Sequence, residues 1–99
     1  MLLQLVRIKG PSMAPTLRDG DAVVVRLGAR VRPGQVVVGR FDGVAGLVVK
    51  RAVRAVGERW WLESDNEFVT DDSRRYGPAV VEGRVLVRYL PLRSLRRVR

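Results

Sequence analysis

The chain contains no cysteine and no histidine. Without cysteine there is neither a disulfide framework nor a thiol nucleophile, and without both residue types the common zinc sites are excluded. Catalytic triads that use histidine as the base are excluded as well. If the protein is an enzyme with a nucleophile, its base at neutral pH must therefore be a carboxylate, a tyrosinate or an amine.

Lysine is scarce too, because arginine fills 17 of the 19 basic positions and only Lys9 and Lys50 are lysines. Arginine cannot release its proton in a protein, whereas a lysine can act as a base when burial among apolar groups lowers its pKa. Lys50 lies in the apolar run 47–53, with Val48 and Ala52 expected on its face of a strand, and Lys9 has no such surroundings. Lys50 is therefore the candidate base.

Long hydrophobic runs are also missing. Every apolar run is far shorter than the roughly 20 residues that span a bilayer, and the first seven residues are too short for the core of a signal peptide. We therefore expect a cytoplasmic protein without a transmembrane anchor. Its basic residues 93–99 are suited to weak contact with an anionic membrane surface.

The formal net charge of +9 is compatible with nucleic-acid binding. However, the arginines are scattered singly through the apparent strands, no groove-reading motif is present, and only two Phe, two Trp and two Tyr are available for base stacking. A solvated basic surface is the simpler interpretation, and no nucleic-acid partner is expected.

Short valine-rich runs separated by Gly, Pro and Asp are typical of an all-β domain. We assign one small domain to residues 1–92, followed by a basic tail at residues 93–99. Residues 67–78 are too rich in Asp, Arg and Gly for a strand and are expected to form a functional loop. Helices should be few or absent, and strands are predicted at residues 3–8, 22–27, 35–41, 46–56, 59–63 and 83–90.

Ser12 is the candidate nucleophile, because it follows a predicted strand and lies between Pro11 and Pro15, which stiffen the backbone on both sides. Taken alone, Ser12 and Lys50 each have a plainer interpretation. Ser12 can cap a short helical turn, and Lys50 can be an edge-strand lysine whose ammonium group reaches water.

Four sequence boxes in order favour the catalytic interpretation. Together they resemble the signal peptidase I family of serine proteases, and the resemblance covers nearly the whole chain. The boxes are Ser12-Met13-Ala14-Pro15-Thr16-Leu17 for the nucleophile, Gly20-Asp21-Ala22-Val23-Val24-Val25 for the strand that follows, Lys50-Arg51-Ala52-Val53 for the base, and Ser64-Asp65-Asn66 with Thr70-Asp71-Asp72-Ser73-Arg74 and Gly77 for the closing segment.

The resemblance implies a small domain of coiled antiparallel sheets, like those of signal peptidases and repressor autoproteases, and a Ser/Lys dyad. Ser12 would attack the scissile carbonyl, and Lys50, arriving neutral, would take its proton and later pass it to the leaving amine. Thr70 would orient the lysine amine through its hydroxyl. Asp72 and Arg74 would form an ion pair that supports the loop beneath the dyad.

Two departures from the family pattern concern the rest of the site. The backbone N–H of Ser12 would be one oxyanion donor, but Gly10 stands where many members have a serine that supplies the second, so that donor must come from elsewhere. Ser64 replaces the glycine of the closing box, which is tolerable if its φ is negative. Met13 is a candidate for the wall of a substrate pocket, with ordinary core packing as the alternative.

The interval between the base and closing boxes indicates the type of enzyme. Only 15 positions separate Lys50 from Asp65, whereas signal peptidases proper are expected to carry a β-rich insertion there, together with membrane anchors. The short form most resembles the nickel-type superoxide dismutase maturation proteases. The resemblance then implies a serine endopeptidase that removes an N-terminal prosequence from a precursor protein and needs no metal or cofactor.

Alternatives remain open at this point. One is a signal peptidase I-like enzyme that cleaves exported preproteins, and another is the autoproteolytic domain of SOS-type repressors, against which the Asp72-Ser73-Arg74 segment argues. From a different class, a non-catalytic basic β-domain that binds nucleic acid would explain the charge. The position of Lys50 distinguishes a protease from a binding module. A binding module should place the Lys50 amine in water, whereas a protease should aim it at Ser12.

Overall fold

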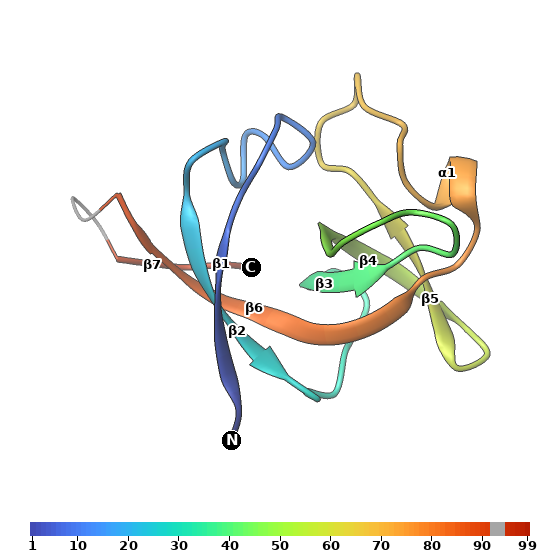
Figure 1. Cartoon of the computed structure of the whole chain (residues 1–99), viewed down its shortest axis with the longest axis horizontal. Helices are drawn as coiled ribbons and strands as arrows, with labels where there is room; N and C mark the ends of the chain where they lie inside the picture. The colour runs from blue at the N-terminus through green and yellow to red at the C-terminus, as the bar shows by residue number, and fades with distance from the viewer. Residues whose placement is uncertain (92–94) are drawn as a thin grey trace.

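Seven strands of the computed structural model, which describes residues 1–91 and 95–99, form one antiparallel sheet (Figure 1). The order across the sheet is β1-β2-β6-β3-β4-β5, and β7 pairs with β6. The strands are β1 (Leu3–Arg7), β2 (Ala22–Leu27), β3 (Val36–Arg40), β4 (Val48–Val56), β5 (Arg59–Glu63), β6 (Val80–Leu90) and β7 (Arg96–Arg97), and the short helix α1 covers Ser73–Tyr76.

The all-β prediction with few helices is confirmed. β6 begins at Val80, earlier than predicted, and α1 occupies four residues of the segment expected to be irregular. β7 lies in the predicted basic tail, while the proposed boundary between residues 92 and 93 falls outside the described residues. No helix in the described part of the chain is long and apolar enough to cross a membrane.

β6 holds the two halves of the sheet together, because it pairs with β2 along most of its length and with β3 at its start. Two glycines allow close backbone approach where these strands meet. A Cβ at Gly83 would lie 2.7 Å from the carbonyl oxygen of Arg26, and a Cβ at Gly39 would lie 2.7 Å from that of Val80. Any larger residue there would force the strands apart.

Both faces of β3 are buried, because successive side chains point to opposite faces of a strand. Val36 and Val38 belong to one apolar cluster, which also contains Met13 and Leu17 of the loop after β1. Val37 belongs to a second cluster on the other face, with Phe41, Ala52, Leu62 and Ala79. Because Met13 and Leu17 belong to the first cluster, the Ser12 loop covers that cluster on one face of β3.

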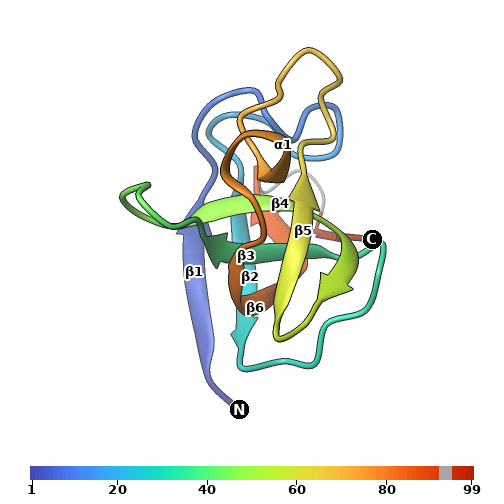
Figure 2. The ribbon, with the colours of Figure 1, turned by 90° about the vertical axis from the view of Figure 1, so that its right-hand side faces the viewer.

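Two loops that are distant in the sequence lie side by side at one end of the molecule. Figures 1 and 2 show residues 10–20 and residues 65–72 at the same end, opposite the N-terminus. Asn66 joins them, since its backbone N–H donates to the Ser12 carbonyl oxygen at 2.9 Å and its side-chain amide donates to the Pro11 carbonyl oxygen at 3.0 Å. The predicted nucleophile and closing boxes thus meet in space.

Candidate active site

Ser12 lies in a tight loop between β1 and β2. The Ile8 N–H donates to the Asp21 carbonyl oxygen at 2.7 Å and the Leu17 N–H to the Met13 carbonyl oxygen at 2.9 Å, so the loop is closed at its base and contains one helical turn. The side chains of Met13 and Leu17 are 1% and 0% exposed. Buried residues on one side and Asn66 on the other hold Ser12, which is itself half-buried.

Gly10 is explained by its backbone. Its φ is +80°, a conformation that residues with a Cβ rarely adopt, so a serine at this position would be strained. Its N–H donates to Asp19 Oδ1 at 2.7 Å. The absence of the expected serine therefore has a conformational cause, and the Gly10 N–H is already engaged by a carboxylate rather than open to a substrate.

Lys50 is buried near the start of β4. It is paired with Val37 of β3, and only 5% of its surface is exposed. The neighbours predicted on its face, Val48 and Ala52, pack in the second apolar cluster. Burial lowers the pKa of the Lys50 amine; attraction to Asp72 and Asp71 opposes this effect, and repulsion from Arg74 adds to it. The pKa of the residue predicted to be the base is thus shifted in the direction that a lysine base requires.

The Lys50 amine touches a hydroxyl. Its Nζ donates a hydrogen bond to Ser64 Oγ at 3.1 Å, and within the described residues no hydrogen bond joins it to Ser12 Oγ. Thr70, to which the resemblance gives the orienting role, is exposed, so that role stays a prediction. Among the described residues no amino acid other than glycine has a positive φ, so Ser64 meets the condition for replacing the glycine of the closing box.

Asp72 and Arg74 form an ion pair directly behind Ser64. Asp72 is fully buried, lies 2.6 Å from Arg74 Nη2, and accepts the Ser64 N–H at 2.8 Å. Asp72 also caps α1 by accepting the Arg74 N–H. Burial alone would raise the pKa of Asp72, but hydrogen bonds from Arg74 and from the Ser64 N–H hold it below its usual range. The charged form of the carboxylate is therefore favoured, and hydrogen bonds from Ser64 and Arg74 hold it.

A second ion pair, whose residues had no assigned role in the sequence, anchors the other side of the closing box. Arg51 donates to both carboxylate oxygens of Asp65, at 3.0 and 2.5 Å, and Thr16 Oγ1 donates to Asp65 Oδ2 at 2.5 Å. Burial alone would raise the pKa of Asp65, but the hydrogen bonds from Arg51 and Thr16 lower it. Because Thr16 belongs to the Ser12 loop, Asp65 and Asn66 together fix that loop to the strand that carries Lys50.

Ser12 and Lys50 open into the same cleft, which has a volume of about 210 Å³. Its walls come from the end of β1 and the two residues after it, from the Ser12 loop, and from the start of β4 with the residue before it. The lining residues are Val6, Arg7, Ile8, Lys9, Ser12, Met13, Leu47, Val48, Val49 and Lys50. Met13 is a core residue that also lines the cleft, so its role in substrate binding stays a prediction.

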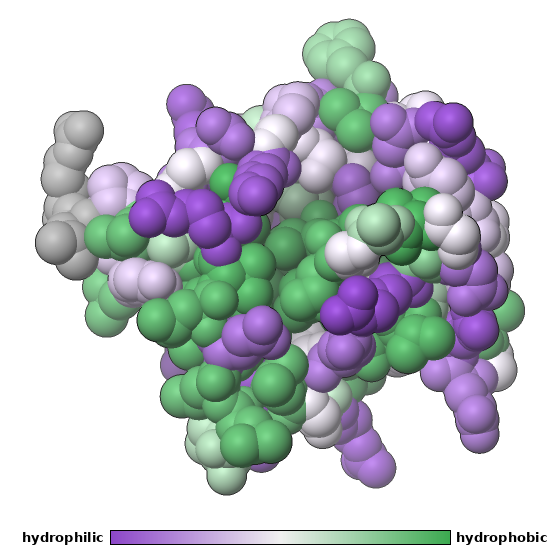
Figure 3. Space-filling view, viewed as in Figure 1, coloured by the Kyte–Doolittle hydropathy of each residue, from purple (hydrophilic) through white to green (hydrophobic). Residues whose placement is uncertain are grey.

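The surface beside the cleft is apolar. Figure 3 shows hydrophobic side chains extending from the N-terminal end of the molecule towards the middle of the visible face. Leu3 and Leu5 of β1 are 55% and 64% exposed, and Met1 and Leu2 are more exposed still. β1 pairs only with β2 among the described strands, so it presents a free edge as well as apolar side chains.

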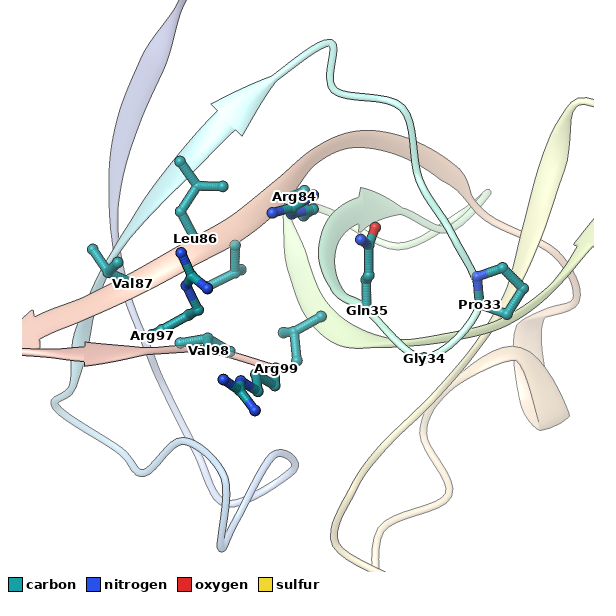
Figure 4. A pocket seen from close by; sticks show the side chains of 11 residues that line it. Pro33, Gly34, Gln35, Arg84, Leu86, Val87, Arg97, Val98 and Arg99 are labelled. Carbon is teal, nitrogen blue, oxygen red and sulfur yellow. The ribbon is translucent and has the colours of Figure 1, made fainter.

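A larger cavity, of about 690 Å³, lies elsewhere (Figure 4). It follows β6 between β7 and the segment before β3, and Arg84, Arg97 and Arg99 are among its lining residues. None of the residues predicted for catalysis lines it. The smaller cleft is therefore the candidate active site, because among the described residues it combines a hydroxyl nucleophile, Ser12, with a buried amine, Lys50.

Comparison with known proteins gives an independent view of the chain. A family model described as peptidase S24-like matches residues 3–86. The mitochondrial inner membrane protease subunit 1 of Xenopus tropicalis is 29% identical to the chain over 119 aligned positions, which cover 92% of the chain and 71% of that relative. The residues matched by the family model include both Ser12 and Lys50.

We expect Asp72→Asn to lower the free energy of unfolding by about 1–3 kcal/mol, because it weakens buried hydrogen bonds to a charged carboxylate. Asp71→Asn is the matched control, since the neighbouring Asp71–Arg75 pair is exposed and its loss should cost less than about 1 kcal/mol. Urea unfolding measures both.

The pH dependence of this effect has a definite sign. Because the folded-state pKa of Asp72 is lowered, its contribution is present at neutral pH and is lost as the pH falls through that pKa. The difference between the wild type and Asp72→Asn should therefore shrink in acid. Equal stabilities of the Asp71 and Asp72 variants at neutral pH would contradict the assigned role of Asp72.

Proposed function

The chain belongs to the peptidase S24-like family, and from this premise we propose that it is a serine endopeptidase with Ser12 as the nucleophile and Lys50 as the general base. The observation that carries the proposal is that the two side chains line one cleft while Lys50 is buried and its pKa is lowered. The name of the Xenopus relative, a protease subunit, supports the same class of activity.

The chemistry follows from a neutral Lys50 amine. Lys50 takes the proton of Ser12 Oγ as this oxygen attacks the scissile carbonyl, and the Ser12 N–H stabilises the oxyanion. When the tetrahedral intermediate collapses, Lys50 passes the proton to the leaving amine. A water molecule, deprotonated by the same amine, then releases the acyl group from Ser12. The amine reaches Ser12 once substrate fills the cleft, since catalytic hydrogen bonds tighten on binding.

The substrate is an extended segment of a precursor protein. Residues of β1, which has a free edge, and of the start of β4, whose described partner over Val48–Lys50 is β3, line the cleft. An extended peptide can add to such edges through main-chain hydrogen bonds. Val6, Ile8 and Val49 offer shallow apolar contacts, which suit small side chains next to the cleaved bond.

For the physiological substrate we propose the N-terminal prosequence of a nickel-type superoxide dismutase, processed in the cytoplasm with weak contact between the basic tail and a membrane surface. The short interval between Lys50 and Asp65 supports this choice. The runner-up is an enzyme that cleaves exported preproteins, which the name of the inner membrane protease relative favours.

A non-catalytic basic domain that binds nucleic acid is the alternative from another class. That interpretation requires the Lys50 amine to lie in water. The observed exposure of 5% argues against it, because the desolvation of a lysine has no use in a binding surface that relies on charge.

Ser12→Ala and Lys50→Met should each lower precursor cleavage by at least about 1000-fold, because each removes one member of a dyad that acts as a unit. Lys50→Arg keeps the charge but cannot release a proton, so it should be equally inactive. Circular dichroism establishes that the variants are folded. Retained cleavage by a folded Ser12→Ala or Lys50→Arg protein would disprove the dyad.

The substrate class is tested by incubating the purified chain with unprocessed nickel superoxide dismutase and, separately, with a secretory precursor. Mass spectrometry of the new N-termini should show cleavage of the dismutase alone, and the Ser12→Ala protein should show none. Cleavage of the secretory precursor alone would favour the runner-up. Cleavage of neither would contradict both substrate assignments.

A further inference from the structure

We propose that Ser64 positions the amine of Lys50 for catalysis, a role that rests on the proposed serine endopeptidase function. Neither the family match nor the four sequence boxes give Ser64 this role, since the closing box that the chain resembles has a glycine at this position. The proposal stands on direct contact, because Ser64 Oγ accepts a hydrogen bond from Lys50 Nζ at 3.1 Å.

This contact can aim the amine. A neutral lysine amine has two N–H bonds and one lone pair, and free rotation about the terminal C–N bond spreads the lone pair over many directions. When one N–H donates to Ser64 Oγ, the directions left to the lone pair are restricted. A base that must take a proton from Ser12 Oγ gains from such restriction, because proton transfer depends on geometry before it depends on pKa.

Ser64 is itself held firmly. It follows directly after β5, and its backbone N–H donates to Asp72 Oδ2 at 2.8 Å. Asp72 is fully buried and receives two hydrogen bonds from the Arg74 guanidinium, at 3.0 and 2.6 Å. The hydroxyl therefore projects from a backbone fixed by a buried carboxylate, as a positioning group requires.

The register of the β4–β5 hairpin brings Ser64 to Lys50. Arg51 of β4 is paired with Glu63 of β5, so the next positions outward on the two chains are Lys50 and Ser64. Thr70 lies six positions further on, and its contact in the loop is made by its carbonyl oxygen, which accepts the Asp72 N–H at 2.9 Å. A serine at position 64 can therefore do here what the resemblance assigns to Thr70.

Ser64 can affect both the position of the Lys50 amine and its pKa, and these two effects have opposite consequences for activity. Its hydroxyl oxygen also accepts a hydrogen bond from the charged ammonium, which favours the charged form. Removing the hydroxyl should therefore lower the pKa of Lys50 further and make more of the amine neutral. If Ser64 only tuned the pKa, Ser64→Ala would be as active as the wild type or more active near neutral pH; if it positions the amine, activity falls.

The experiment compares kcat and KM for precursor cleavage by the wild type, Ser64→Ala, Ser64→Thr and Thr70→Ala. We expect Ser64→Ala to lower kcat by about 10- to 100-fold with KM little changed, as a misplaced catalytic group does. Ser64→Thr keeps the hydroxyl and should recover most of the rate. Thr70→Ala should lose less of kcat than Ser64→Ala, because Lys50 Nζ donates to Ser64 Oγ, and an equal or larger loss in Thr70→Ala would return the positioning role to Thr70.

Two kinetic outcomes would overturn the proposal. One is an unchanged kcat in Ser64→Ala, and the other is an equal loss in Ser64→Ala and Ser64→Thr, which would deny a role to the hydroxyl. Thermal unfolding of each variant separates loss of activity from loss of the fold.

A second readout does not need proteolysis. The chain has only two lysines, so ¹³C NMR of the lysine side chains can follow Lys50 directly, with its signal assigned by its loss in Lys50→Met. Ser64→Ala should lower the pKa of Lys50, and Thr70→Ala should leave it unchanged. A lowered pKa of Lys50 in Thr70→Ala and an unchanged pKa in Ser64→Ala would show that Thr70, and not Ser64, contacts the amine. If the wild type cleaves no precursor, the proposed function fails, while this titration still decides whether Ser64 contacts the amine.

Discussion

The buried carboxylate of Asp72 is the interaction on which the rest of the site depends. It accepts the backbone N–H groups of Ser64 and Arg74 and pairs with the Arg74 guanidinium, so it fixes the end of β5 and the start of α1 together. Burying the charged carboxylate without these hydrogen-bond donors would cost free energy. The parts of the loop that supply the donors therefore stabilise one another. From this loop Ser64 contacts Lys50 and Asn66 holds the Ser12 backbone. One segment thereby contacts both members of the proposed dyad.

The two members of this ion pair shift the pKa of Lys50 in opposite directions, and the larger effect, that of Asp72, raises it. Burial beneath the apolar cluster lowers the pKa of the amine, while the negative charges of Asp72 and Asp71 raise it. Arg74 sits on Asp72 and its positive charge opposes that of Lys50, which lowers the pKa again. Asp72 and Arg74 therefore act on Lys50 in two ways, through the hydrogen-bonded backbone of Ser64 and through their charges near the Lys50 amine.

The sequence predicts most of the fold because its strands alternate regularly between Gly, Pro and Asp turns, and it predicts that Lys50 shares a face with Val48 and Ala52. β7 escapes prediction, since Arg96 and Arg97 pair through their backbone and carry no apolar alternation. The contact between Lys50 and Ser64 could not be predicted from the sequence for a different reason. It depends on an irregular register between Ala52 and Arg54 in the β4–β5 hairpin, and a shift of one residue changes which side chain faces Lys50.

The central claim is that a neutral, buried Lys50 is the base for Ser12. The most direct test is to measure the pKa of Lys50 by NMR and compare it with the midpoint of the pH dependence of kcat/KM for precursor cleavage, which reports the essential groups of the free enzyme. The account predicts that kcat/KM rises with pH and that the two midpoints coincide, below the ordinary pKa of lysine. A kcat/KM that stays constant while Lys50 titrates would contradict it.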